Sequence, residues 1–384
     1  MMKIKNIFLL AFFVFLLTIV LSAHIVWALE KETHKFLNMS IARNYSILNN
    51  YLKNQLGFSK GIEAIFVYEN QSKTVEEWIG IGGKKEDEPM YTRSLNHFHD
   101  PLKTWDIAGF KGISKSSILW AHDQGLAGFL TGGNFAWKNV REYFYTALTG
   151  KDFSGTWIAY SQAEKEIYYG ATFRGIGQLM HLVEDASVPA HTRDDSHVAG
   201  YHYEKAVDKL RNKLDPVFTN AIANPITFDP TILTLTANPL APIPIAKIFD
   251  ADRYDGLNAS AGINQGLSEY SNANFFSEDT IFNAAYPYPK ESSTDLQSYI
   301  NQNKLPEMVI GEDNIPDTSF YIKKISDGET VDHFVKPGYL TKEALDMGLT
   351  ISYLTYTLDD VCYKDYAQKL IPRAVGYSAG LLNY

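Results

Sequence analysis

The chain of 384 residues contains a single cysteine, Cys362. One cysteine excludes an internal disulfide framework and any zinc site built from several cysteines. A bound metal would therefore have to use imidazoles and carboxylates, and the sequence offers ten histidines. We expect Cys362 itself to be a small buried hydrophobic residue.

Basic residues are also scarce, since 35 lysines and arginines face 44 acidic residues and give a net charge of −9. This balance argues against a protein that holds polyanions by bulk charge, so any phosphate site should be local. Hydrophobic residues make up 45% of the chain, which excludes a disordered composition and leaves ample material for a buried core.

Beyond residue 28, no apolar run approaches the roughly 20 residues that a membrane-spanning helix needs. Residues 1–28 differ, because a positively charged start precedes an apolar run from Ile7 to Leu21. This pattern predicts an export signal. Both Leu21-Ser22-Ala23 and Val26-Trp27-Ala28 resemble cleavage sites, and an uncleaved anchor is the alternative. We expect a protein that is secreted, periplasmic or held in the cell envelope.

Residues 29–384 are interpreted as one helical domain, a mainly α fold. Helical spacing of apolar residues predicts helices over 31–56, 115–148, 158–187, 201–214 and 257–270, and again from 340.

Three segments depart from the helical pattern. Residues 80–101 contain three glycines near their start and two prolines, which predicts a long loop. Residues 215–245 hold six of the fifteen prolines and predict an irregular excursion. Residues 319–335 alternate like strands around Asp327-Gly328, which predicts a small β-hairpin.

The sharpest local signal lies between His181 and His191. His181 and Asp185 are four residues apart, so on a helix they project from one face and can bind a single cation. Pro189 should end that helix and let His191 fold back beside the same face. The alternative is a buried polar cluster in which the histidine is hydrogen-bonded to the aspartate.

Other histidines cluster in two further places. Asn96-His97-Phe98-His99-Asp100-Pro101 carries two, and the stretch after His191 carries His197, His202 and Glu204. The second group makes a further possible metal set, whereas His99 is expected to be a structural or surface residue, with contact to substrate as the alternative.

These motifs together resemble the zinc-dependent phospholipase C family, which is related to the fungal single-strand nucleases. The likeness extends from about Trp27 to Leu214. It implies a mostly helical fold with a three-zinc cleft that cleaves phosphate esters.

The resemblance implies a ligand set for each metal. The first would be bound by His97, His181, Asp185 and a loop carboxylate, assigned to Asp87 with Glu86 and Glu88 as alternatives. The second would be bound by His191, His197 and Glu204. The third would be bound by His34, by Asp185 as a bridge, and by the free amine and carbonyl of an N-terminal tryptophan, for which Trp27 is the candidate.

The second set departs from the family pattern, in which histidine and glutamate are four residues apart. Here Gly200 occupies that position and His197 precedes Glu204 by seven residues, so His202 competes as the ligand.

The expected function is that of an exported phosphoesterase with two or three zinc ions, and Asp87 would act as base or orienter for the attacking water. We expect phospholipid or a membrane surface as substrate. Nucleic acid is less favoured because the region from Glu86 to Glu204 contains no run of basic residues. A binding protein that keeps the metals without turnover is the rival from another class. The sequence indicates no obligate protein partner.

Overall fold

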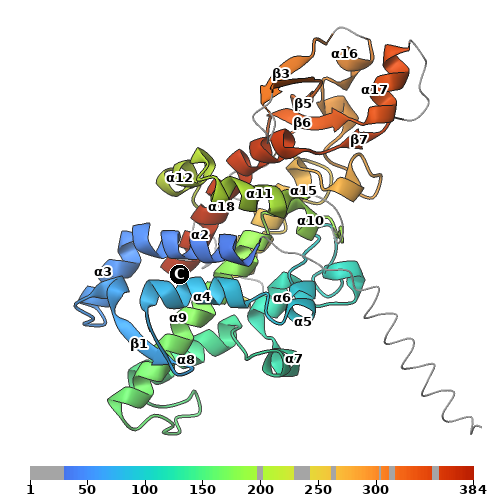
Figure 1. Ribbon diagram of the computed structural model, residues 1–384. Coiled ribbons are helices and arrows are strands. Elements are labelled where there is room, and N and C mark those ends of the chain that lie inside the picture. The colour runs from blue at the N-terminus through green and yellow to red at the C-terminus, as the bar shows by residue number, and fades with distance from the viewer. Residues whose placement is uncertain are drawn as a thin grey trace, which may run out of the picture.

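The computed structural model describes residues 30–196, 202–228, 243–260, 265–301, 304–310, 316–347 and 354–384. The described chain is mainly helical with small antiparallel sheets, as the sequence predicts (Figure 1). The α-helices are α2 (Lys31–Asn44), α3 (Ser46–Asn54), α4 (Val75–Lys85), α5 (Met90–Arg93), α6 (Ser117–His122), α7 (Gly125–Leu130), α8 (Trp137–Thr149), α9 (Gln162–Asp185), α10 (Pro189–Thr192), α11 (Tyr203–Asn212), α12 (Pro216–Ala223), α14 (Ala246–Phe249), α15 (Leu267–Asn274), α16 (Leu296–Ile300), α17 (Tyr339–Asp346) and α18 (Asp360–Asn383). None of them is long and apolar enough to cross a membrane.

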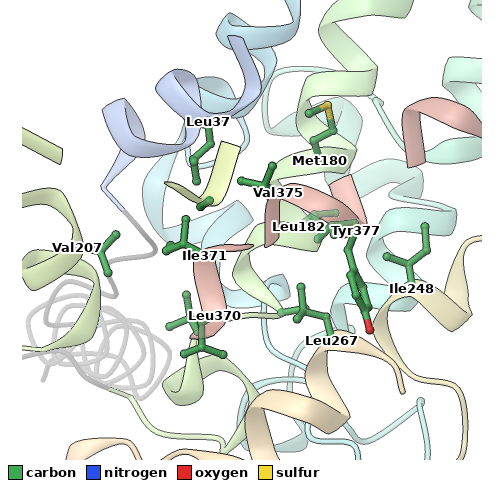
Figure 2. Close-up of a cluster of buried hydrophobic side chains, with 14 of the residues drawn as sticks. Leu37, Met180, Leu182, Val207, Ile248, Leu267, Leu370, Ile371, Val375 and Tyr377 are labelled. Atoms are coloured by element: carbon green, nitrogen blue, oxygen red, sulfur yellow. The ribbon is translucent and has the colours of Figure 1, made fainter. Parts of the chain in front are cut away.

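Two helices of 24 residues, α9 and α18, form the centre of the molecule. Helix α9 packs against α4 and α8, and α18 packs against α9, α11 and α12. Their contact buries one continuous apolar core, in which Leu37 of α2, Leu182 of α9 and Val375 of α18 lie close together (Figure 2). Cys362 is buried in the same core, as predicted. The core holds the C-terminal end of α9 in place, and this end carries His181 and Asp185.

The prediction of a long loop over residues 80–101 is wrong in its first part, because residues 75–85 form α4. Thr74 caps this helix in a reciprocal box with Glu77. The glycines have a packing role. A Cβ atom built on Gly82 would lie 2.0 Å from the carbonyl oxygen of Arg174, and one on Gly177 would lie 1.9 Å from that of Ile79. Glycine therefore allows α4 and α9 to touch backbone to backbone.

Other helix boundaries also differ from the prediction. The helix expected over 31–56 is broken at Tyr45, and the region 115–148 contains three helices, α6 to α8. Of the helix expected over 257–270, the described residues form α15 from Leu267, whereas Leu257 and Ser260 donate backbone hydrogen bonds to side chains of the turn and residues 261–264 lie outside the described part. In the proline-rich region, Pro216 starts α12 because proline fits the first helical turn, and residues 229–242 lie outside the described part.

The predicted hairpin is confirmed. Strand β5 (Ile322–Lys324) pairs with β6 (Val331–Pro337), and Asp327 and Gly328 adopt the positive φ angles of the turn. Strand β7 (Tyr356–Thr357) extends this sheet, and two further hairpins pair β1 (Ile65–Tyr68) with β2 (Gln71–Thr74) and β3 (Glu307–Ile310) with β4 (Pro316–Ser319). Strands β3 to β7 form a lobe with α16 and α17 at one end of the molecule (Figure 1).

Candidate metal centre

The last turns of α9 place His181 and Asp185 on one buried face, with Nε2 of His181 3.1 Å from Oδ2 of Asp185. Nδ1 of His181 lies 2.7 Å from the carbonyl oxygen of Gly83 in α4. Because a carbonyl only accepts hydrogen bonds, Nδ1 must be the protonated nitrogen there. Nε2 is then the nitrogen that faces Asp185, as a proton donor when His181 is charged and as a metal ligand when an ion replaces that proton.

His97 and Asp87 approach the same point from the segment after α4. Nδ1 of His97 lies 2.8 Å from Oδ2 of Asp185 and 3.3 Å from Nε2 of His181. Oδ1 of Asp87 lies 3.6 Å from Nδ1 of His97 and 3.7 Å from Nε2 of His181. The four side chains that the resemblance assigns to one metal thus converge.

The structure distinguishes Asp87 from the two neighbouring glutamates. Glu86 forms an ion pair with Arg93 at 2.6 Å and accepts a hydrogen bond from the Trp120 indole, also at 2.6 Å. Its Oε1 lies 3.8 Å from Nε2 of His97, which is not the ring nitrogen that faces Asp185. Burial alone would raise the pKa of Glu86, but Arg93 and His97 outweigh it and lower the pKa to about 2. Glu88 pairs with two lysines near the surface. Asp87 is therefore the carboxylate of this trio best placed to contact a metal.

His34 reaches the cluster from α2. Its Nε2 lies 3.2 Å from Oδ1 of Asp185, and its ring stacks on that of His181 with centroids 3.7 Å apart. Oδ2 of Asp185, by contrast, faces His97, His181 and, at 3.6 Å, Nδ1 of His191. The two oxygens of Asp185 thus face different histidines, as a bridging carboxylate would.

Sequence reasoning missed Glu184. Its Oε2 lies 2.5 Å from Nδ1 of His34, so it fixes the orientation of that ring while Nε2 faces Asp185. The only signal in the sequence was the acidic pair Glu184-Asp185, and helical spacing alone places their side chains on different faces.

Only part of the second expected set of metal ligands, His191, His197 and Glu204, lies within the residues that the structure describes. His191 in α10 stacks on Phe98, and its Nε2 lies 3.6 Å from Oε1 of Glu204 in the first turn of α11. His202, the competitor for the ligand position, lies with Nδ1 2.6 Å from Oε2 of Glu204. His197 lies outside the described residues, as does Trp27.

The carboxylates and imidazoles of the cluster stabilise one another's charged forms and so shift one another's pKa values. Burial raises the pKa of Asp185, but the neighbouring histidines His181, His191 and His34 outweigh it and hold the pKa well below its usual value. Burial likewise lowers the pKa of His181, yet Asp185 and Asp87 outweigh it and raise the pKa to about 10. A cation binding here would compete with protons, so its affinity should rise with pH.

Several buried atoms in this cluster make no hydrogen bond of regular geometry with the described residues, although the oxygens of Asp185 lie within ion-pair distance of three histidines. They are Nε2 of His34, Nε2 of His97, Oδ1 of Asp87 and both carboxylate oxygens of Asp185. Buried carboxylate oxygens without regular hydrogen bonds are costly unless a positive charge, from protonated histidines or a bound metal ion, compensates them. Two overlapping triads, His34-Asp87-His181 and His97-His181-Asp185, have ligand atoms within 4.8 Å of one another, so the cluster can bind a metal ion.

His99 is buried beside the cluster but takes a different partner. Its Nε2 lies 3.0 Å from Oδ2 of Asp250, which also accepts a hydrogen bond from the Trp105 indole. His99 therefore helps to hold the loop after His97.

Comparisons of the chain with protein-family models, with curated proteins and with solved structures find no match.

Proposed function

We propose that this protein is a zinc-dependent phosphoesterase that cleaves the headgroup phosphodiester of phospholipids. The observation that carries the proposal is the convergence on Asp185 of side chains from α2, α9, α10 and the segment after α4. These are the positions that the resemblance to the zinc-dependent phospholipase C family assigns to the metals.

The chemistry of the donors supports zinc. The cluster offers imidazole nitrogens and carboxylate oxygens but no thiolate, a mixed set that zinc accepts in hydrolytic sites. His97, His181, Asp185 and Asp87 would hold one ion, and His34 with Asp185 would contribute to a neighbouring one. His191, Glu204 and either His197 or His202 would hold another. Bound zinc supplies Lewis-acid activation of the phosphate ester and of the attacking water.

The protein's own residues would accept the proton from water and orient the metal ligands. Asp87 has 7% of its side chain exposed, whereas those of His97, His181 and Asp185 are fully buried. Asp87 is therefore the group of this set best placed to accept a proton from water at the edge of the cluster. Gly83 and Glu184 orient His181 and His34.

Charge favours a phospholipid over a nucleic acid. A nuclease holds a polyanion in a basic groove with aromatic platforms. Here the net charge is −9, and the segment from Glu86 to Glu204 has no basic run. A zwitterionic headgroup needs only the metals for its phosphate and an aromatic or acidic face for its cation.

The decisive experiment assays zinc-loaded protein against phosphatidylcholine and against single-stranded RNA and DNA. We expect release of phosphocholine and little cleavage of either nucleic acid. Faster nucleic-acid cleavage would reverse the substrate ranking. Bound zinc without turnover of any substrate would favour the binding-protein rival.

Export is part of the proposal, and N-terminal sequencing of the exported protein tests it. A start at Trp27 would provide the free amine for the third ion. A start at Leu29, or an intact leading segment, would leave only His34 and Asp185 for that ion and favour a two-zinc site.

A further inference from the structure

Helix α7 turns its large apolar side chains toward solvent. Leu126, Phe129 and Leu130 are 72%, 71% and 70% exposed, whereas Gly128 is buried. A helix on the surface of a soluble protein normally shows the reverse pattern, with polar residues outward. Three large apolar side chains exposed on one short helix call for a ligand or partner surface.

The outward orientation is fixed by the contacts of the inner face. A Cβ atom at Gly128 would lie 2.2 Å from Oδ1 of Asn134 and 2.5 Å from Cβ of Gln124, so glycine favours this close approach of the inner face. The hydroxyl of Thr131 donates to the carbonyl of Ala127 at 2.7 Å, and the side chain of Gln124 accepts a hydrogen bond from the backbone of Phe135 at 2.9 Å. The helix is therefore held at both ends with its apolar residues outward.

Hydrogen bonds connect the segment that follows α7 to the neighbourhood of the candidate metal centre. Arg93 donates to the carbonyl oxygens of Thr131 and Gly133 at 3.3 and 3.2 Å, and its other nitrogen pairs with Glu86, the neighbour of Asp87. Figure 1 shows α7 at the edge of the helical body, near α5. These contacts link the segment that follows α7 to the residue next to Asp87.

The rim of the surface is locally basic. Lys115 donates to the backbone carbonyl of Asp123 at 2.8 Å, and the ammonium of Lys138 lies 3.3 Å from the carboxylate of the same residue. Two ammonium groups thus lie beside a single acidic residue, Asp123, in a protein whose net charge is −9. Burial and these two lysines lower the pKa of His122.

We propose that Leu126, Phe129 and Leu130 form a docking surface for a phospholipid bilayer that contains anionic lipids. The apolar side chains enter the boundary of the acyl region, and Lys115 and Lys138 face the headgroups. The inference rests on the proposed function in one respect, since it explains how a bilayer substrate would be brought to the cluster.

The test is co-sedimentation of the full protein with vesicles of phosphatidylcholine and phosphatidylglycerol. A variant with Leu126→Ser, Phe129→Ser and Leu130→Ser should lose at least about tenfold in partitioning, because each side chain gives up its apolar burial. Phe129→Ser alone should show a smaller loss in the same direction. Omitting phosphatidylglycerol should weaken binding by the wild type.

The matched control is Leu305→Ser, Met308→Ser and Ile310→Ser, which removes three side chains of similar exposure, 84%, 77% and 67%, in another part of the chain. This variant should bind vesicles like the wild type. Equal loss in both triple variants, no vesicle binding by the wild type, or a wild-type dimer that the α7 substitutions dissociate would each overturn the proposal.

Vesicle binding requires no turnover, so its result is independent of the proposed activity. Hydrolysis of a short-chain phosphatidylcholine dispersed as monomers reports the metal centre alone. The α7 variant should keep that activity and lose activity on vesicles. Absence of hydrolysis of every phospholipid by the wild type would refute the proposed function, while the sedimentation result would still decide the docking surface.

Discussion

At the scale of single residues, Asp185 is the position on which the candidate site depends most. Its two oxygens face different histidines, Oδ1 toward His34 and Oδ2 toward His97 and His181. Replacing it should therefore disturb more than one metal position, whereas replacing any one histidine should disturb fewer contacts.

We predict that Asp185→Asn loses more than one zinc equivalent per chain, measured by elemental analysis after zinc loading and dialysis. The amide is neutral and binds zinc poorly, so both ions that share the carboxylate should be weakened. Asp250→Asn is the matched control, because Asp250 is also a buried aspartate bound to a histidine, His99, outside the cluster. It should keep its zinc. Full zinc content in Asp185→Asn would refute the bridging assignment.

The ligand position beside Glu204 can be tested in the same way. His197 and His202 are the two candidates for this position, and the zinc contents of His197→Ala and His202→Ala distinguish them. The resemblance assigns the position to His197, so His202→Ala should keep its zinc and His197→Ala should lose about one equivalent. The contact of His202 with Glu204 at 2.6 Å makes the opposite result the specific alternative.

Glu86 is predicted to act on stability and not on metal content. Glu86→Gln breaks a fully buried ion pair with Arg93 and should cost about 3 kcal/mol of unfolding free energy, with the zinc content of the folded protein unchanged. If the folded Glu86→Gln protein instead lost about one equivalent of zinc, Glu86 would be a metal ligand.

The effect should depend on pH with a definite sign. Because the pKa of Glu86 in the folded protein is lowered from 4.5 to about 2, its stabilisation is complete above pH 4.5 and is lost as the pH falls toward 2. Denaturant unfolding of both proteins should show the difference shrinking over that window. A difference that stays constant from pH 6 to pH 2 would contradict this account.

At the scale of elements, the contact between α4 and α9 sets the geometry of the site. Gly82 and Gly177 allow the two backbones to approach closely, and this approach brings the carbonyl of Gly83 to within 2.7 Å of Nδ1 of His181. A wider helix separation would leave that nitrogen without its partner and the ring free to turn.

We therefore predict that Gly82→Ala lowers both stability and zinc affinity. The added methyl group would meet the backbone of α9, at a cost of about 1–3 kcal/mol or more, and thermal unfolding with zinc titration measures both effects. The control is Gly380→Ala in α18, where the nearest atoms to a Cβ lie at 3.5 Å or more. That substitution should be neutral or stabilising by up to about 1 kcal/mol, because alanine favours helix. If Gly82→Ala, like the control, left both stability and zinc affinity unchanged, the close packing of α4 and α9 would not be what positions His181.

At the scale of the whole molecule, metal binding should couple distant parts of the chain. The candidate ligands come from α2, the segment after α4, α9, α10 and α11, so a bound ion links elements far apart in sequence. Any ion that binds only the folded state adds to its stability by mass action.

Chelation should therefore lower the Tm as well as abolish activity. At zinc one hundred times above its Kd, a single site contributes about 2.7 kcal/mol. Scanning calorimetry before and after chelation, and again after zinc is restored, measures the effect. Unchanged Tm and unchanged metal content after chelation would contradict a zinc cluster that bridges these elements.

The sequence by itself determined the helical class, the hairpin at Asp327-Gly328 and the shared face of His181 and Asp185, because each follows from local spacing or from the φ requirement of a turn. It also pointed to Asp87, though only as one of three acidic neighbours. Only the tertiary structure decided that Glu86 forms an ion pair with Arg93 and that Glu184 orients His34. It also decided that the glycine-rich stretch in α4 is helix and not loop. These outcomes depend on contacts between residues far apart in the chain, and the local sequence does not determine which partner a buried group contacts.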